Sequence, residues 1–111
     1  MNTEITEKTE NRVQSKIEVQ AVEPKLKEPA MFKVTMHNDD FTPMEFVVAV
    51  LELFFGMERA KAISVMFEVH SVGQAVCGTY SKDVADTKVE QVTEYARRHD
   101  HPLLCSIEAV R

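Results

Sequence analysis

The sequence predicts a single compact α+β domain in which three helices pack on a three-stranded, mainly antiparallel sheet. Three observations support this fold class. Short runs over residues 32–37, 74–80 and 103–110 have the composition of strands. Longer segments between them repeat apolar residues at intervals of three and four, as amphipathic helices do. The length of 111 residues suits one domain, and the element order is β-α-α-β-α-β.

The first strand is predicted from alternating apolar and polar side chains over residues 32–37, F-K-V-T-M-H. A helix should follow, because Thr42 and Glu45 have the spacing of a capping box and Pro43 suits the first helical turn. Its apolar face repeats at helical spacing and comprises Phe46, Val47, Val50, Leu51 and Phe54. Gly56 can adopt the positive φ that ends a helix.

A second helix is predicted over residues 57–70, stopping before Gly73. Its short link to the first helix requires the two to pack as a hairpin. Residues 74–80 form the second predicted strand. Gly78 within that strand indicates a bulge or a close approach of the backbone.

The third helix is predicted to begin after Ser81, a suitable N-cap residue, with Asp83 in its first turn. Its buried stripe comprises Ala85, Val89, Val92 and Ala96. Pro102 favours an extended backbone at His101, so the helix should end before it. Residues 103–110 form the last predicted strand.

Residues 1–29 differ in composition from the rest of the chain. They are rich in Glu, Lys, Thr and Gln, contain no Gly and no aromatic residue, and have apolar residues too scattered to form a core. We therefore predict a flexible N-terminal tail over residues 1–29 and a folded domain over residues 30–111.

Composition excludes several classes of function. The formal net charge is −5, and Arg97-Arg98 is the only basic doublet of the predicted domain, so we expect no nucleic-acid partner. The longest apolar run, residues 46–55, is far shorter than the ~20 residues of a membrane span. Cys77 and Cys105 lie in apolar strands, which favours buried free thiols over a disulfide or a metal pair. Nothing resembling a secretory signal precedes them, so we expect a cytoplasmic protein without a cofactor.

The densest group of polar residues is His37-Asn38-Asp39-Asp40, between the first strand and the first helix. Taken alone it predicts a turn, because Asn and Asp favour turns. The wider pattern suggests more. Residues 38–47 read N-D-D-F-T-P-M-E-F-V and residues 101–105 read H-P-L-L-C, with Val69-His70, Cys77-Gly78 and Thr87-Lys88-Val89 between them.

In this order and spacing, these segments together resemble ClpS, the bacterial adaptor family of the N-end rule pathway, over residues 30–107. The resemblance implies a non-enzymatic adaptor for protein degradation. Such an adaptor binds the free α-amino group and the bulky hydrophobic first residue (Leu, Phe, Tyr or Trp) of N-degron substrates. It then delivers them to a ClpA-type AAA+ unfoldase-protease.

The resemblance places the amino-group site at Asn38, Asp40 and His70, with Asp39 contributing mainly through its backbone. These roles agree with the chemistry of an α-ammonium, which brings three donors and one positive charge. A carboxylate, an amide oxygen and a neutral imidazole nitrogen can accept its hydrogen bonds.

The resemblance also implies a hydrophobic pocket for the first side chain. Its residues would be His37, Thr42, Met44, Val47, Met66, Val69 and Leu103, with His37 at the edge. Met44 resembles the family's gatekeeper against β-branched first residues. For each position ordinary core packing is the alternative, and for Val47 or Leu103 taken alone it is the favoured one.

The resemblance also implies that Asp83 and Lys88 dock to the N-domain of a ClpA-type or ClpC-type unfoldase. It further implies that the adaptor is a monomer and that its N-terminal tail enters the unfoldase. The alternative is that both residues are ordinary solvated charges.

The rival class is a small metal-binding or hydrolytic domain. His37, Asp39, Asp40 and His70 include donors that suit Zn²⁺ or Mn²⁺. Adjacent Asp side chains at the end of a strand diverge, however, and the sequence contains no H-E-x-x-H or C-x-x-C spacing. The adaptor is therefore the favoured interpretation.

Overall fold

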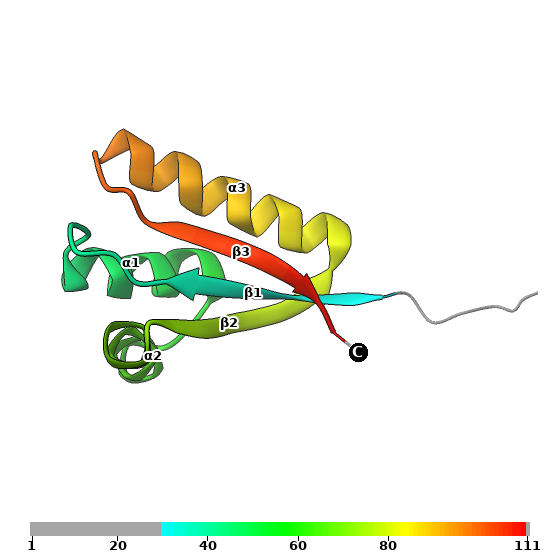
Figure 1. Ribbon diagram of the computed structural model, residues 1–111, viewed down its shortest axis with the longest axis horizontal. Coiled ribbons are helices and arrows are strands. Elements are labelled where there is room, and N and C mark those ends of the chain that lie inside the picture. Colours follow the sequence, from blue (N-terminus) through cyan, green and yellow to red (C-terminus); the bar gives the residue numbers. More distant parts are fainter. Residues whose placement is uncertain (1–29, 111) are drawn as a thin grey trace, which may run out of the picture.

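A computed structural model describes residues 30–110 of the chain (Figure 1). Its elements are β1 (Met31–His37), α1 (Met44–Phe55), α2 (Arg59–Val72), β2 (Gln74–Ser81), α3 (Lys82–Arg98) and β3 (Leu104–Ala109). This order confirms the predicted β-α-α-β-α-β fold. The predicted tail over residues 1–29 lies outside the described residues. Within residues 30–110, no helix is long and apolar enough to cross a bilayer.

The sheet has the strand order β2-β1-β3, with both pairs antiparallel. The first strand is therefore central, and β2 and β3 are both edges. Val34 pairs with Gly78 whereas Thr35 pairs with Val76, which leaves Cys77 as an extra residue. The predicted irregularity at Gly78 is thus a bulge. A Cβ at Gly78 would clash with the Tyr80 hydroxyl, so the tyrosine ring occupies the space of a side chain there.

The core lies between the helices and one face of the sheet. Val34 and Met36 of the central strand are fully buried, and they alternate with Lys33 and Thr35, which belong to the other face. Every element contributes to the buried cluster, which includes Val48, Val50, Leu51, Ala62, Val65, Ala75, Ala85, Val92, Ala96 and Leu103. In Figure 1, α3 runs along β3, whereas α1 lies lengthwise in the view and α2 is seen end-on. The two shorter helices therefore cross each other, and the prediction that they pack as an antiparallel hairpin is wrong.

The start of α1 differs from its prediction. The helix begins at Met44, Pro43 is the N-cap residue, and no side chain caps the end. Instead, the Thr42 hydroxyl donates to Oδ2 of Asp39 at 2.8 Å. The predicted capping box is therefore wrong, because Asp39, three residues earlier, accepts the hydrogen bond of the threonine that was expected to cap the helix.

Two glycines end helices as predicted, and one of them also positions the loop after β1. Gly56 (φ 64°) and Gly73 (φ 105°) adopt the left-handed conformation at the ends of α1 and α2. The carbonyl of Gly73 accepts a 2.9 Å hydrogen bond from the backbone N–H of Asn38. This bond fixes the end of β1 beside the last turn of α2, which carries His70.

Candidate functional site

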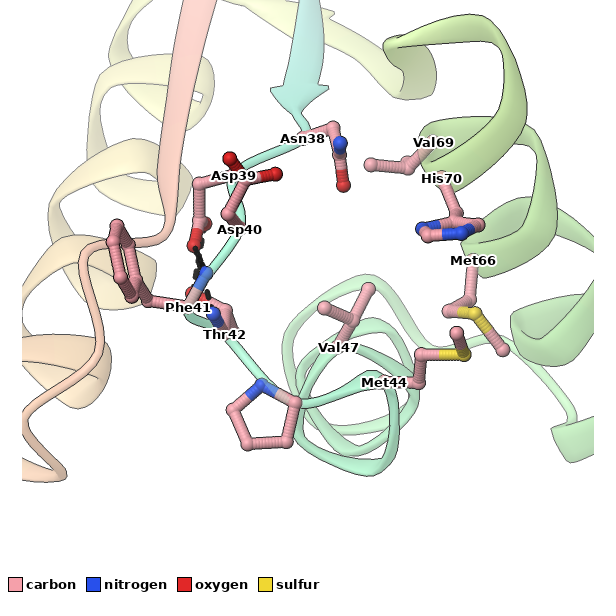
Figure 2. A pocket seen from close by; sticks show the side chains of 11 residues that line it. Asn38, Asp39, Asp40, Phe41, Thr42, Met44, Val47, Met66, Val69 and His70 are labelled. Atoms are coloured by element: carbon pink, nitrogen blue, oxygen red, sulfur yellow. Dashed lines mark hydrogen bonds between the residues drawn. The ribbon is translucent and has the colours of Figure 1, made fainter.

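A cavity of about 340 Å³ opens where the loop after β1 faces the end of α2 (Figure 2). Its volume is at the lower end of the range for small-molecule sites. The lining residues come from three consecutive parts of the chain. They are Asn38, Asp39, Asp40, Phe41, Thr42 and Pro43 of the loop, Met44 and Val47 of α1, and Met66, Val69 and His70 of α2.

The polar residues of the cavity lie at its rim. Figure 2 shows Asn38 and Asp40 on one side of the opening and His70 on the other. All three residues are exposed. The structure thus brings an amide, a carboxylate and an imidazole from two separate elements around one opening. This combination can accept several hydrogen bonds from one small cation.

Asp39 has a different environment from Asp40. Its Oδ1 accepts from the backbone N–H groups of Phe41 (2.8 Å) and Thr42 (2.7 Å), and its Oδ2 accepts from the Thr42 hydroxyl. Partial burial would raise the pKa of Asp39, but the Thr42 hydroxyl, the two backbone N–H groups and nearby His101 together lower it below its ordinary value of 3.8. The carboxylate of Asp39 therefore shapes the loop that carries Asn38 and Asp40.

The inner wall of the cavity is apolar. Val47, Met66 and Val69 line it and are buried, whereas Met44 is 45% exposed at its mouth. Figure 2 shows Met44 and Met66 on the same side of the cavity. Unbranched thioether side chains adapt to apolar groups of different shape. The arrangement can hold one bulky apolar side chain next to a cationic group at the rim.

Two residues predicted for the hydrophobic pocket lie apart from this lining. The imidazole Nε2 of His37 is 2.7 Å from the hydroxyl of Ser106 on β3. Leu103 is 2% exposed and belongs to the core cluster. Ligand contact by either residue stays a prediction. Conversely, Phe41 and Pro43 line the cavity although sequence reasoning did not select them, and their place inside the N-D-D-F-T-P-M segment was the available signal.

The two residues predicted for docking both lie on α3. Asp83 is exposed in its first turn. The ammonium of Lys88 donates to the carbonyl of Phe54 at 2.6 Å, and it lies above the rings of Tyr80 and Phe55. Lys88 therefore connects α3 to the end of α1, a role that the sequence did not reveal.

The arrangement does not support a metal centre among the described residues. Within residues 30–110, no three His, Cys, Asp or Glu side chains are grouped so that they could hold a metal ion. The four residues of the metal-site alternative, including His37 and His70, are thus not assembled into a ligand set. Cys77 and Cys105 are both free and buried, and burial raises the pKa of each thiol to about 12.

Comparison with known proteins identifies the family. Residues 27–106 match the family described as the ATP-dependent Clp protease adaptor protein ClpS. The chain belongs to the ClpS family. It is thus a Clp protease adaptor, a non-catalytic protein.

Individual members of the ClpS family are similar over most of the chain. The ATP-dependent Clp protease adapter protein ClpS of Methylococcus capsulatus is 59% identical over 90 residues, 81% of this chain and 85% of that protein. The protein of the same name from Vibrio atlanticus is 55% identical over 86 residues, which covers 78% and 81% of the two chains. The solved structure of Agrobacterium tumefaciens ClpS2 bound to L-phenylalaninamide has a TM-score of 0.73 and 35% identity, and covers 75% of this chain and 100% of its own.

Proposed function

We propose that this ClpS chain binds the first residue of N-degron substrates in the cavity between the β1–α1 loop and α2. Asn38, Asp40 and His70 accept hydrogen bonds from the free α-amino group. The first side chain, from Leu, Phe, Tyr or Trp, enters the apolar part of the cavity. The observation that carries the proposal is the placement of three polar acceptors around the opening of an apolar cavity of about 340 Å³.

The solved relative supports this choice of ligand. L-Phenylalaninamide, to which Agrobacterium tumefaciens ClpS2 is bound, combines a free α-amino group with one bulky apolar side chain. The cavity offers matching chemistry for both parts, with Asp40 at the rim and Val47, Met66 and Val69 in the wall. Thr42 and Met44 complete the wall near the mouth, where Met44 restricts the shape of the side chain that enters.

Magnitudes indicate how the two parts share the binding energy. Burial of a Leu-sized side chain contributes about 1.5 to 3 kcal/mol. A hydrogen bond to a charged group contributes about 1.5 to 3 kcal/mol net. A micromolar complex needs about 8 kcal/mol, and association also costs translational and rotational freedom. Additional contacts to the peptide backbone must therefore contribute.

Substrate delivery completes the proposed function. The exposed side chain of Asp83 on α3 is a docking contact for the N-domain of a ClpA-type or ClpC-type AAA+ unfoldase, and Lys88, five residues further along the same helix, is a second one. Residues 1–29 engage the unfoldase during transfer, and residues 30–111 form the folded adaptor domain. The adaptor acts in the bacterial cytoplasm, where its two buried thiols stay reduced.

Peptide affinities measured by calorimetry test the proposal. Matched peptides that begin with Leu or Phe should bind, whereas those that begin with Val should bind at least about tenfold more weakly because Met44 excludes branching at Cβ. Asp40→Asn and His70→Ala should each weaken binding of the Phe peptide by about ten- to a hundredfold without lowering the melting temperature. Equal affinity of both variants and the unmodified protein would contradict the proposal.

A further inference from the structure

The edge strand β3 borders a groove that the proposed function does not use. Among residues 30–110, β3 pairs only with β1, so its other edge carries no strand of the described part of the chain. A hollow of about 630 Å³ lies there between β3 and α3. It is lined by Asp86, Val89, Glu90 and Thr93 of the helix and by Ser106 and Ile107 of the strand.

The alternation of hydrogen-bonded pairs between β1 and β3 shows which backbone groups of β3 face this groove. The backbone N–H of Val110 donates to the carbonyl of Met31 at 2.8 Å, in register with the pairing of β1 and β3. Hydrogen-bonded and non-hydrogen-bonded pairs alternate in an antiparallel ladder. Cys105, Ile107 and Ala109 therefore turn their N–H and C=O groups to the free edge. Such an edge can pair with an extended peptide.

The groove begins next to the proposed binding cavity. His37 pairs with Leu104, the first residue of β3, and Asn38 follows directly. A hollow of about 410 Å³ around Leu103, Leu104 and the His101-Pro102 turn shares Thr93 with the groove along β3. The start of β3 thus lies one strand away from the end of β1 that leads into the amino-group site, and a peptide that leaves the cavity crosses the β1–α1 loop and the start of β3 to reach the free edge.

Exposed apolar side chains mark the same route. Phe41 is 78% exposed at the mouth of the cavity, and Leu104 is 58% exposed at the start of β3. The ring of His101 lies 4.4 Å from that of Phe46, which holds the His101-Pro102 turn against the start of α1. Leu104 is therefore presented next to a turn that is held in place, and Phe41 is held by the hydrogen bond from its backbone N–H to Asp39.

We propose that the substrate segment that follows the bound first residue adds as a fourth strand to the free edge of β3, in the groove between β3 and α3. This proposal rests on the proposed function. The segment runs parallel to β3, because the amino-group site lies at the start of that strand. The added strand lies two strand spacings, about 9.6 Å, from β1, so at about 3.3 Å per residue the fourth substrate residue is the first that can reach it. Substrate residues from about the fourth to the seventh then lie along β3 from Leu104 past Ile107.

The walls of the groove specify the composition of this segment. Glu90 supplies negative charge along one wall, next to Asp86, whose carboxylate is paired with Lys82 at 2.9 Å. Val89 and Ile107 are partly buried apolar surface. Side chains of an added strand point alternately to opposite faces. The groove therefore favours a segment in which small apolar residues alternate with Lys or Arg over one with Asp or Glu.

Calorimetry with the full chain tests this proposal. The probes are L-phenylalaninamide and Phe-first peptides from tripeptide to nonapeptide, with Lys or Glu at the fifth and seventh residues of the peptides long enough to contain them. We expect affinity to rise about five- to tenfold between the tripeptide and the heptapeptide, equivalent to one or two net backbone hydrogen bonds, and then to level off. The Lys peptides should bind more tightly than the Glu peptides, and added salt should reduce that difference.

Two variants locate the effect. Thr93→Trp fills the groove and should abolish the gain with length, whereas Thr87→Trp, on another face of the same helix, should retain it. Glu90→Lys should reverse the preference for Lys peptides over Glu peptides. Because Glu90 is exposed, this substitution does not disturb the packing of the core. Phenylalaninamide affinity should stay the same in all three proteins.

The outcomes separate the two proposals. Affinity that does not change with peptide length, or a gain with length that survives both Thr93→Trp and Glu90→Lys, would overturn the groove proposal and leave the first-residue site intact. Failure of phenylalaninamide itself to bind would overturn the proposed function and the groove proposal with it.

Discussion

Replacement of Asp39 by Ala separates its structural role from ligand binding. The Asp39 carboxylate accepts three hydrogen bonds of 2.7 to 2.8 Å, two from backbone N–H groups and one from the Thr42 hydroxyl. Asp40 lies next to it at the rim of the cavity. We therefore expect Asp39→Ala to lower stability and affinity together, whereas Asp40→Asn lowers affinity alone.

The magnitude follows from the three bonds. A hydrogen bond to a charged group contributes about 1.5 to 3 kcal/mol net when it is buried. Asp39 is only partly buried, so water can replace the lost acceptor at the Phe41 and Thr42 amides, and we expect about 2 kcal/mol for all three bonds. In a domain of this size that corresponds to a melting temperature lower by about 8 to 16 °C. Thr42→Val, which removes one bond, should cost about 0.5 to 1 kcal/mol.

Urea denaturation followed by circular dichroism measures these differences, and its pH dependence gives a further check. The pKa of Asp39 is lower in the folded protein than its ordinary value of 3.8. The stabilisation by Asp39 is therefore present above pH 3.8 and is lost as pH falls through the folded pKa. The difference in free energy of unfolding between the unmodified protein and Asp39→Ala should therefore become smaller in that acid range. Equal stability of the two proteins near neutral pH would refute the structural role of Asp39.

Three other predictions concern the core and α3. Leu103→Ala should lower the free energy of unfolding by about 2 to 5 kcal/mol, because Leu103 is 2% exposed. Urea denaturation measures this loss, and a negligible loss would contradict the placement of Leu103 in the core. Lys88→Met should lower the free energy of unfolding by about 1 kcal/mol, because the hydrogen bond to the Phe54 carbonyl is lost. An unfoldase-binding assay with this variant therefore needs a parallel melting curve. An unchanged melting temperature would contradict the contribution of this bond. Cys77 and Cys105, whose pKa burial raises to about 12, should resist a disulfide reagent at pH 8 until urea is added, and rapid labelling of the native protein would show that they are accessible.

The fold was predictable because local signals agree with one another. The alternation of β1, the apolar stripe of α3 and the glycines at the ends of α1 and α2 all predict the elements that the structure contains. Gly78 even indicated the bulge in β2. Such agreement between local pattern and global fold is expected of a sequence that specifies one structure.

The details of the site were less predictable because side chains compete for the same partners. Thr42 has the sequence spacing of a helix cap. Asp39, however, accepts hydrogen bonds from the backbone N–H groups of Phe41 and Thr42, two and three residues later, and from the Thr42 hydroxyl as well. Leu103 shows a second difficulty, because cavity walls and cores use the same residue types. Only the packing of the H-P-L-L-C segment shows that this leucine lies in the core.

Lys88 shows a third difficulty. Its partners, the carbonyl of Phe54 and the rings of Tyr80 and Phe55, are on other elements, and no local pattern connects them. Contacts of this kind depend on the packing of α1 against α3, which sequence periodicity predicts only in outline.

The central claim is that the cavity binds a free α-amino group together with a bulky apolar side chain. Calorimetric titration with L-phenylalaninamide and with its N-acetylated form tests it most directly, because acetylation removes the positive charge and two of the three donors. The account predicts that the free amine binds and that the acetylated compound binds at least about a hundredfold more weakly. Equal affinity for the two compounds, or no binding by the free amine, would contradict it.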